Sequence, residues 1–153
     1  LMCITTYAAP AYGDVVAEVE DALLTAAERA RAAGVAADRI ALDPGIGFGK
    51  ELAHNLALLA ALPRLAAHGF PVLVGTSRKS FLGRITGVDA ADRRLAGSLA
   101  SAVLAARDGA RIVRVHDVAG TVAALRVLEA VDTAARDAAA RDAAAHAAAG
   151  GRP

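Results

Sequence analysis

Aromatic residues are scarce in this chain: they make up 3% of its 153 residues, and tryptophan is absent. The hydrophobic core therefore has to come from Leu, Val and Ile packed closely with Ala, which suits helices lying directly on a sheet. Cys3 is the single cysteine, which excludes a disulfide framework and a cysteine metal cage and favours a reducing, cytoplasmic compartment. No apolar run approaches the roughly 20 residues that span a bilayer, so we expect no membrane contact.

The chain also lacks an excess of charge of either sign. The 17 basic and 16 acidic residues leave a net charge of +1 at pH 7, which gives no case for nucleic acid as a partner. Among the basic residues 15 are Arg, and only Lys50 and Lys79 are Lys. Both lysines stand in loops that follow short apolar runs, which indicates a chemical demand for an ammonium group there. The four histidines show no paired ligand spacing, so we predict no metal site built by this chain.

Short apolar runs alternate with longer stretches of helical spacing. We expect strands at 1–6, 40–42, 71–75 and 112–115, and helices at about 14–33, 51–68, 92–108 and 121–147. In the first helix, Val15, Val19 and Leu23 recur at four-residue steps and form one apolar stripe. Strands that alternate with helices predict βα units and a parallel sheet.

Four such units are half of a (β/α)8 TIM barrel, which needs eight units and about 250 residues. An open α/β sheet is the alternative, with a ligand crevice where the strand order reverses, and the sequence does not show strand order. The chain opens with Leu1 inside an apolar run, which looks like a cut start and favours half a barrel. We expect a partial barrel domain at 1–131 and an Ala-rich helical or disordered tail at 132–153.

Polar residues cluster directly after the predicted strands. The second strand is followed by "LDPGIGFGK", the third by "GTSRKSFLG", and the fourth carries "RVHDV". Because the carboxyl ends of parallel strands share one face, these three segments should meet there. They bring together a carboxylate, an ammonium, a guanidinium and an imidazole, with glycines that permit close backbone approach. Such a set suits a flat, polar heterocycle beside a phosphorylated group.

Several common motifs are excluded by spacing. "GIGFG" fails the dinucleotide fingerprint after Gly47, and "GTSRKS" lacks the glycine interval of a P-loop. Ser77 or Ser80 with His116 would suggest nucleophilic catalysis, but no G-x-S-x-G elbow is present. No protein nucleophile is therefore expected.

The three segments, in this order and at these intervals, closely resemble the dihydropteroate synthases. The stretches "YGDVVAEVEDALL", "GVAADRIALDPG" and "HNLALLAALPRL" are similar to that family too, so the likeness runs from about Tyr12 to Leu128. The resemblance implies the C-terminal four β/α units of a (β/α)8 TIM barrel. It also implies a transferase of folate biosynthesis that condenses 4-aminobenzoate with 7,8-dihydropterin-6-ylmethyl diphosphate, giving dihydropteroate and diphosphate.

The resemblance further assigns roles to individual residues. Asp43 matches the aspartate that binds the amino-pyrimidine edge of the pterin, and Gly47 falls in the pterin pocket. Phe48 and Ser80 fall at the aminobenzoate pocket, and Lys79 contacts the pterin and shapes that pocket. Arg114 and His116 match the pair that receives the diphosphate. The catalytic residues implied are Lys79, Arg114 and His116. Independently of the resemblance, we expect the carboxylate of Asp117 to orient Arg114 or His116.

The family's N-terminal half, with its Asn ligand for Mg²⁺, has no counterpart here, and "LMCITTYAAP" departs from the family's fifth-strand pattern. We therefore expect a fragment that binds pterin weakly and turns over negligibly, whereas the full-length enzyme would be a homodimer. A pterin-binding methyltransferase domain and a catalytically dead half-barrel are the alternatives.

Overall fold

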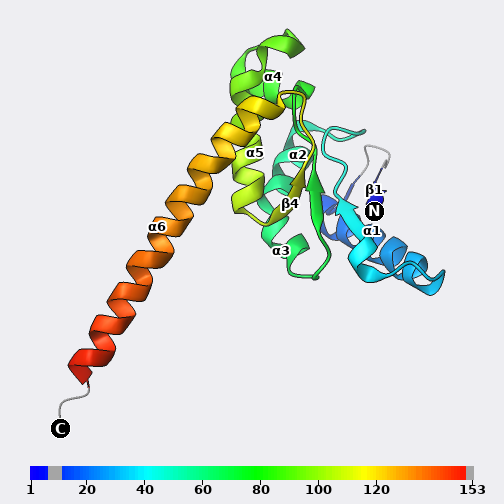
Figure 1. Ribbon diagram of the computed structural model, residues 1–153. Coiled ribbons are helices and arrows are strands. Elements are labelled where there is room, and N and C mark those ends of the chain that lie inside the picture. Colours follow the sequence, from blue (N-terminus) through cyan, green and yellow to red (C-terminus); the bar gives the residue numbers. More distant parts are fainter. Residues whose placement is uncertain (7–11, 151–153) are drawn as a thin grey trace.

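Strands and helices alternate throughout the computed structural model, which describes residues 1–6 and 12–150 (Figure 1). The strands are β1 Met2–Thr5, β2 Ile40–Asp43, β3 Val72–Val74 and β4 Ala110–Val113. The α-helices are α1 Val15–Ala32, α2 Leu52–Ala60, α3 Leu62–Ala66, α4 Ser80–Thr86, α5 Leu95–Arg107 and α6 Val118–Gly150, and short 3-10 turns cover Ala37–Arg39 and Ala91–Arg93.

The four strands form one parallel sheet in the order β1-β2-β3-β4. Thr5 pairs with Asp43, and Val74 pairs with Val113, so the strands end near one another. An open doubly wound sheet would need a reversal of strand order, and the described strands have none. The sheet is thus an arc of a (β/α) barrel, as expected, and the open-sheet alternative is wrong.

Helix α1 forms where the sequence predicts it. Asp14 caps its first turn, with Oδ1 accepting from the N–H groups of Val16 and Ala17 at 3.1 Å each. The apolar stripe that includes Val19 and Leu23 is buried where α1 packs against β1, β2 and α2. Burial of this stripe, rather than helix propensity, holds α1 on the sheet.

Two of the expected helices differ from the prediction. The stretch 51–68 is broken at Ala61 into α2 and α3, because Pro63 lacks the N–H that a continuous helix would need there. The stretch 92–108 becomes the turn Ala91–Arg93 followed by α5. Helix α4 is additional: it follows "SRK" directly and ends at Gly87, whose φ of +71° stops it.

A polar cluster around the buried Glu20 joins α1 to the region after α2. Glu20 is 5% exposed, and its carboxylate accepts from Arg64 and lies 2.6 Å from Nε2 of His68. The hydrogen bond from Arg64 is the main cause that lowers the pKa of Glu20, with His68 adding to it and burial opposing it. The cluster therefore ties α1 to α3 and to the turn that follows α3.

Helix α6 packs against α5 at its start and then extends far beyond the rest of the molecule (Figure 1). It crosses residue 131 without a break, so no change of structure marks the predicted division between 1–131 and the tail. The side chains from Glu129 to Ala144 are all exposed, and residues 151–153 of the predicted tail lie outside the described residues. None of the described helices is long and apolar enough to cross a membrane.

Candidate active site

The carboxyl ends of the strands bring polar side chains to one edge of the sheet. Asp43 is the last residue of β2, Gly75 follows β3 directly, and Arg114 follows β4 directly. The N–H of Arg114 donates to the carbonyl of Val74 at 2.9 Å, which extends the β3–β4 pairing to this edge. The three loops that carry the sequence motifs therefore start side by side.

Asp43 is buried at this edge, with 3% of its surface exposed. Its Oδ1 accepts the N–H of Gly45 at 2.8 Å, and its Oδ2 lies 3.7 Å from Nη2 of Arg114. A carboxylate offers about four lone-pair positions, and the contact with Arg114 is too long to occupy one as a hydrogen bond. Oδ2 can therefore accept from N–H groups of a ligand.

The glycine-rich loop after β2 is fixed from helix α2. The N–H of Gly47 donates to Oδ1 of the buried Asn55 at 2.6 Å, while Nδ2 of Asn55 donates to the carbonyls of Lys50 and Glu51. Gly47 has a φ of +81°, and a Cβ built there would lie 2.4 Å from Cδ of Lys79. Glycine takes this φ without strain and leaves room for the Lys79 side chain to lie against the loop.

Lys79 lies across this loop. Its Nζ donates to the carbonyl of Ile46 and sits 4.0 Å from the centroid of the Phe48 ring, a cation–π contact. Lys50, the other lysine, also turns inward: its Nζ donates to the carbonyl of Gly45 at 3.0 Å and to Oγ1 of Thr6, after β1, at 3.3 Å. Both ammonium groups thus hold the loop after β2, one from each side.

Burial lowers the pKa of Lys79 from its ordinary 10.5 to about 8. In this net shift of the pKa, the carboxylate of Asp43 opposes the effect of burial, and the positive charges of Arg114 and Lys50 add to it. Burial also lowers the pKa of Lys50. At neutral pH Lys79 is therefore still mostly an ammonium that can donate and attract negative charge, yet it loses its proton more readily than an exposed lysine.

A cleft of about 270 Å³ opens between the loops after β3 and β4. It is lined by Gly75, Ser77, Lys79, Arg114, Val115 and His116. Two cationic side chains and an imidazole around so small a cleft suit an oxygen-rich anion.

Ser77 holds His116 in this cleft. The buried Oγ of Ser77 accepts the N–H of His116 at 3.2 Å and lies 3.0 Å from its Nδ1. The imidazole is therefore oriented by a side chain from the neighbouring loop.

The structure gathers most of the sequence-predicted site residues at this edge: Asp43, Gly47, Phe48, Lys79, Arg114 and His116. Ser80 differs, since it is the exposed first residue of α4 and does not line the cleft. Asp117 was expected to orient Arg114 or His116 but instead starts α6: its Oδ1 accepts the N–H of Gly120 at 2.7 Å. A side chain that caps a helix start explains this difference.

Sequence reasoning did not identify Asn55 or the positioning role of Ser77. The sequence offers Ser77 only as a possible nucleophile, and its motif gives no sign that it holds His116 from 39 positions away. Asn55 carries no motif, although an amide inside an otherwise apolar helix pattern is a signal that could have found it.

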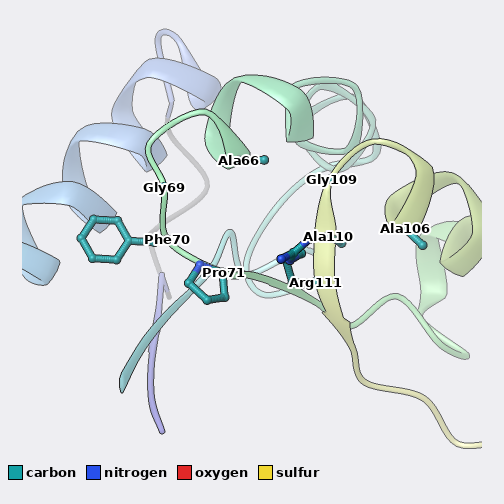
Figure 2. A pocket seen from close by; sticks show the side chains of 8 residues that line it. All are labelled: Ala66, Gly69, Phe70, Pro71, Ala106, Gly109, Ala110 and Arg111. Atoms are coloured by element: carbon teal, nitrogen blue, oxygen red, sulfur yellow. The ribbon is translucent and has the colours of Figure 1, made fainter. Parts of the chain in front are cut away.

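A larger hollow lies at the opposite, amino ends of β3 and β4 (Figure 2). It measures about 530 Å³ and is lined mostly by Gly, Ala and Pro, together with Phe70 and Arg111. Arg111 is the one charged side chain that lines this hollow, and no ion pair of Arg111 is found among residues 1–6 and 12–150, so the hollow offers little chemistry. Nor do the described residues contain a group of three His, Cys, Asp or Glu side chains that could hold a metal ion.

Comparison with known proteins agrees with this arrangement. Residues 2–116 match the family model described as pterin binding enzyme. The dihydropteroate synthase of Escherichia coli K12 is 50% identical over 126 residues, which cover 82% of this chain and 44% of that protein. An inactive dihydropteroate synthase 2 of Mycobacterium bovis is 46% identical over 124 residues, covering 78% of this chain and 38% of that one.

Solved structures agree as well. The dihydropteroate synthase of Xanthomonas albilineans in complex with 7,8-dihydropteroate is 49% identical with a TM-score of 0.83, over 85% of this chain and 50% of that one. The same enzyme with 4-aminobenzoic acid also gives a TM-score of 0.83, at 48% identity over 85% of this chain and 48% of that one. The chain thus spans about half the length of the relatives that it matches. Over that half, this chain belongs to the family of pterin binding enzymes.

Proposed function

We propose that this chain carries part of the active site of a dihydropteroate synthase, a transferase that joins 4-aminobenzoate to 7,8-dihydropterin-6-ylmethyl diphosphate. A bond forms between the arylamine nitrogen and the methylene carbon of the pterin. The carbon–oxygen bond to diphosphate breaks, diphosphate leaves with the bonding electrons, and the nitrogen loses one proton. The single observation that carries the proposal is the convergence of Asp43, Lys79 and Arg114 at the carboxyl edge of the sheet.

The pterin would lie against the loop after β2. Oδ2 of Asp43 would accept two N–H groups of the amino-pyrimidine edge, replacing its long contact with Arg114. Gly47 leaves the loop without a side chain where the flat ring must pass. Lys79 would donate to a ring oxygen or nitrogen once the ligand displaces its contact with Ile46.

The aminobenzoate would lie beyond Lys79. The ring of Phe48, held by the ammonium at 4.0 Å, offers an apolar face to the benzene ring. Ser80, exposed at the start of α4, offers a hydroxyl to the carboxylate from outside the cleft. The structure in complex with 4-aminobenzoic acid comes from a relative 48% identical to this chain.

The diphosphate would occupy the cleft between the loops after β3 and β4. Arg114 and His116 would donate to its oxygens, with His116 held in place by Ser77. Because negative charge builds up on the departing oxygen, fixed cations there stabilise the transition state more than the bound substrate. No residue has to form a covalent intermediate.

The residues of this chain do not fit the Mg²⁺ that the family resemblance implies. Asp43 is the carboxylate beside Arg114, and it is buried and engaged with Gly45. Mg²⁺ binds through carboxylates, water and substrate phosphates, and the side chains that line the cleft offer two cations, one imidazole and one hydroxyl but no carboxylate. We therefore assign no step to the ion here.

An alternative of pterin binding without turnover is favoured by the inactive relative from Mycobacterium bovis. For the isolated chain we expect the same behaviour, with weak pterin binding and negligible turnover. The homodimer and the cytoplasmic location of the full-length enzyme stay predictions.

Calorimetric titration of the chain with 6-hydroxymethyl-7,8-dihydropterin diphosphate tests the proposal. Binding should be weakened by about tenfold or more in Lys79→Ala, because a charged hydrogen bond is lost. Arg126→Ala, on the exposed side of α6, is the control and should bind like the original chain.

Absence of binding in the unaltered chain, or equal binding in both variants, would contradict the proposed pterin site. Catalytic turnover by the isolated chain at the rate of a full-length enzyme would contradict the expected inactivity.

A further inference from the structure

Arg78, directly before Lys79, has an unusual backbone conformation. Its φ is +61°, and it is the one residue other than glycine with a positive φ among residues 1–6 and 12–150. A side chain makes this left-handed conformation unfavourable, so surrounding contacts must impose it. Conformations of this kind recur where a chain holds a functional group in place.

Both polar groups of Arg78's backbone are held by the first turn of α5. Its N–H donates to Oγ of Ser98 at 2.9 Å, and its carbonyl accepts from Nη1 of Arg94 at 2.8 Å. Arg94 and Ser98 lie one helical turn apart, so they present their side chains on the same face. The backbone of Arg78, directly before Lys79, is thus held by two side chains that lie 16 and 20 positions further along the chain.

Arg94 is itself anchored on the loop after α4. Its Nε donates to the carbonyl of Val88 at 2.8 Å, and its Nη2 donates to the carbonyl of Asp89. Gly83 makes room for it, since a Cβ there would lie 2.7 Å from Nε of Arg94. One guanidinium therefore joins three backbone carbonyls, a task that its planar fork of donors allows and a single ammonium does not.

The hydroxyl groups of Ser98 and Ser101 add further hydrogen bonds between α5 and the loop after β3. Oγ of Ser98 donates its hydrogen to the carbonyl of Arg94 at 2.7 Å. The lone pairs of the same oxygen therefore accept the N–H of Arg78. Oγ of Ser101 donates to the carbonyl of Ser98 at 3.0 Å and lies 2.8 Å from Oγ1 of Thr76. The loop after β3 is therefore tied to α5 at two points.

We propose that Arg94 is a positioning residue for Lys79: by holding the carbonyl of Arg78 it imposes the left-handed turn that directs the lysine across the loop after β2. The turn closes with the N–H of Lys79 donating to the carbonyl of Thr76 at 3.1 Å. From there the side chain passes Gly47 and reaches Ile46 and Phe48. Arg94 does not line the cleft, and its side-chain hydrogen bonds go to backbone carbonyls of Arg78, Val88 and Asp89. Its relevance to catalysis rests on the proposed function, but its effect on Lys79 does not.

The chain has only two lysines, so selective labelling reports on Lys79 directly. Lysine labelled with ¹³C and ¹⁵N gives two side-chain signals, which Lys79→Met assigns, and their chemical shifts follow each amine through its titration. In the original chain Lys79 should titrate near its lowered pKa of about 8. In Arg94→Gln we expect this midpoint to rise by about one pH unit or more, because the lysine is no longer held against the loop.

Matched variants separate positioning from general damage. Arg93→Gln changes the adjacent exposed arginine, which makes no side-chain hydrogen bond with the described residues, and should leave the midpoint unchanged. Arg94→Lys keeps the charge without the fork and should behave like Arg94→Gln. Adding Arg78→Gly to Arg94→Gln should move the midpoint back towards the original, because glycine takes a φ of +61° without strain.

An unchanged Lys79 midpoint in folded Arg94→Gln and Arg94→Lys would overturn the proposal. If Arg94→Gln does not fold, Ser98→Ala removes the other grip on Arg78 and should raise the same midpoint, and no change there would overturn the proposal as well. None of these readouts uses a pterin, so a chain that fails to bind ligand leaves this test intact.

Discussion

The hollow at the amino ends of β3 and β4 is about twice as large as the cleft at their carboxyl ends, about 530 Å³ against about 270 Å³. The larger hollow is lined mostly by Gly, Ala and Pro and has one charged side chain, Arg111 (Figure 2). The smaller cleft has Lys79, Arg114 and His116 within the same few loops, beside the buried Asp43. The larger cavity therefore lies at the amino ends of the strands, whereas the side chains that can bind a charged ligand lie at the carboxyl ends.

The difference follows from the direction of the strands. Each parallel strand leaves the sheet at the same edge, so every loop that follows a strand adds its polar residues there. At the amino ends, the chain arrives from helix termini through Gly69 and Gly109, which serve only to turn it. The carboxyl edge accepts buried charge at a cost in stability, whereas the amino edge does not.

The largest effect that would test this comparison is on ligand binding. Asp43→Asn replaces an acceptor with an amide whose N–H₂ would face the donors of the pterin edge, so we expect binding about 10- to 100-fold weaker. Chemical-shift titration with 6-hydroxymethyl-7,8-dihydropterin measures it. Arg111→Gln, at the amino end, is the matched removal of one charge and should bind as the original chain does.

Equal losses in Asp43→Asn and Arg111→Gln would break the distinction between the two ends. A loss in Arg111→Gln alone would move the site to the larger hollow.

Much of this arrangement was predictable from the sequence. Apolar runs alternating with helical spacing gave the four strands within about two residues and the order of helices, because burial on a parallel sheet imposes those periods. The same reasoning placed Asp43, Lys79 and Arg114 at strand ends, and parallel pairing brought those ends together. Resemblance to a known family added what the residues would touch, and those roles stay proposals.

The remainder depends on contacts between distant residues, which periodicity does not encode. Arg94 reaches back 16 positions to Arg78, and His116 meets Ser77 across 39 positions. The break between α2 and α3 was visible in Pro63, but the apolar pattern continued through it and hid the boundary. Helix α4, with seven residues, is too short for its periodicity to stand out.

A smaller effect is expected from two glycines with nearly the same backbone. Gly47 has a φ of +81° beside Lys79, and Gly69 has a φ of +82° with no atom within 4 Å of an added Cβ. Gly47→Ala and Gly69→Ala should each lower the free energy of unfolding by about 1 kcal/mol, since both force a Cβ into the left-handed region. Urea denaturation measures this shared strain.

The two substitutions should differ only at Lys79. The new methyl group of Gly47→Ala must displace the flexible Lys79 side chain from Ile46 and Phe48, so the pKa of Lys79 should rise towards its ordinary value. In Gly69→Ala the same lysine signal should stay where it is. A Lys79 signal that is unmoved in both variants would show that close approach at Gly47 does not hold the lysine.

The last effect concerns pH and tests whether the partly buried charge of Lys79 at the carboxyl edge costs stability. Because the pKa of Lys79 is about 8 in the folded chain and 10.5 when unfolded, the unfolded state binds more protons between these values. The free energy of unfolding should therefore gain a rising component between about pH 8 and 10.5, and none below or above that window. Lys79→Met removes this component, so the original chain should gain stability relative to Lys79→Met between about pH 8 and 10.5. Urea midpoints of the two chains, subtracted at each pH, cancel the contributions of Lys50, Cys3 and Tyr12. A difference in urea midpoint that does not change with pH would mean that Lys79 stays solvated in the folded chain. The charge at the carboxyl edge would then cost no more stability than the charge at the amino edge.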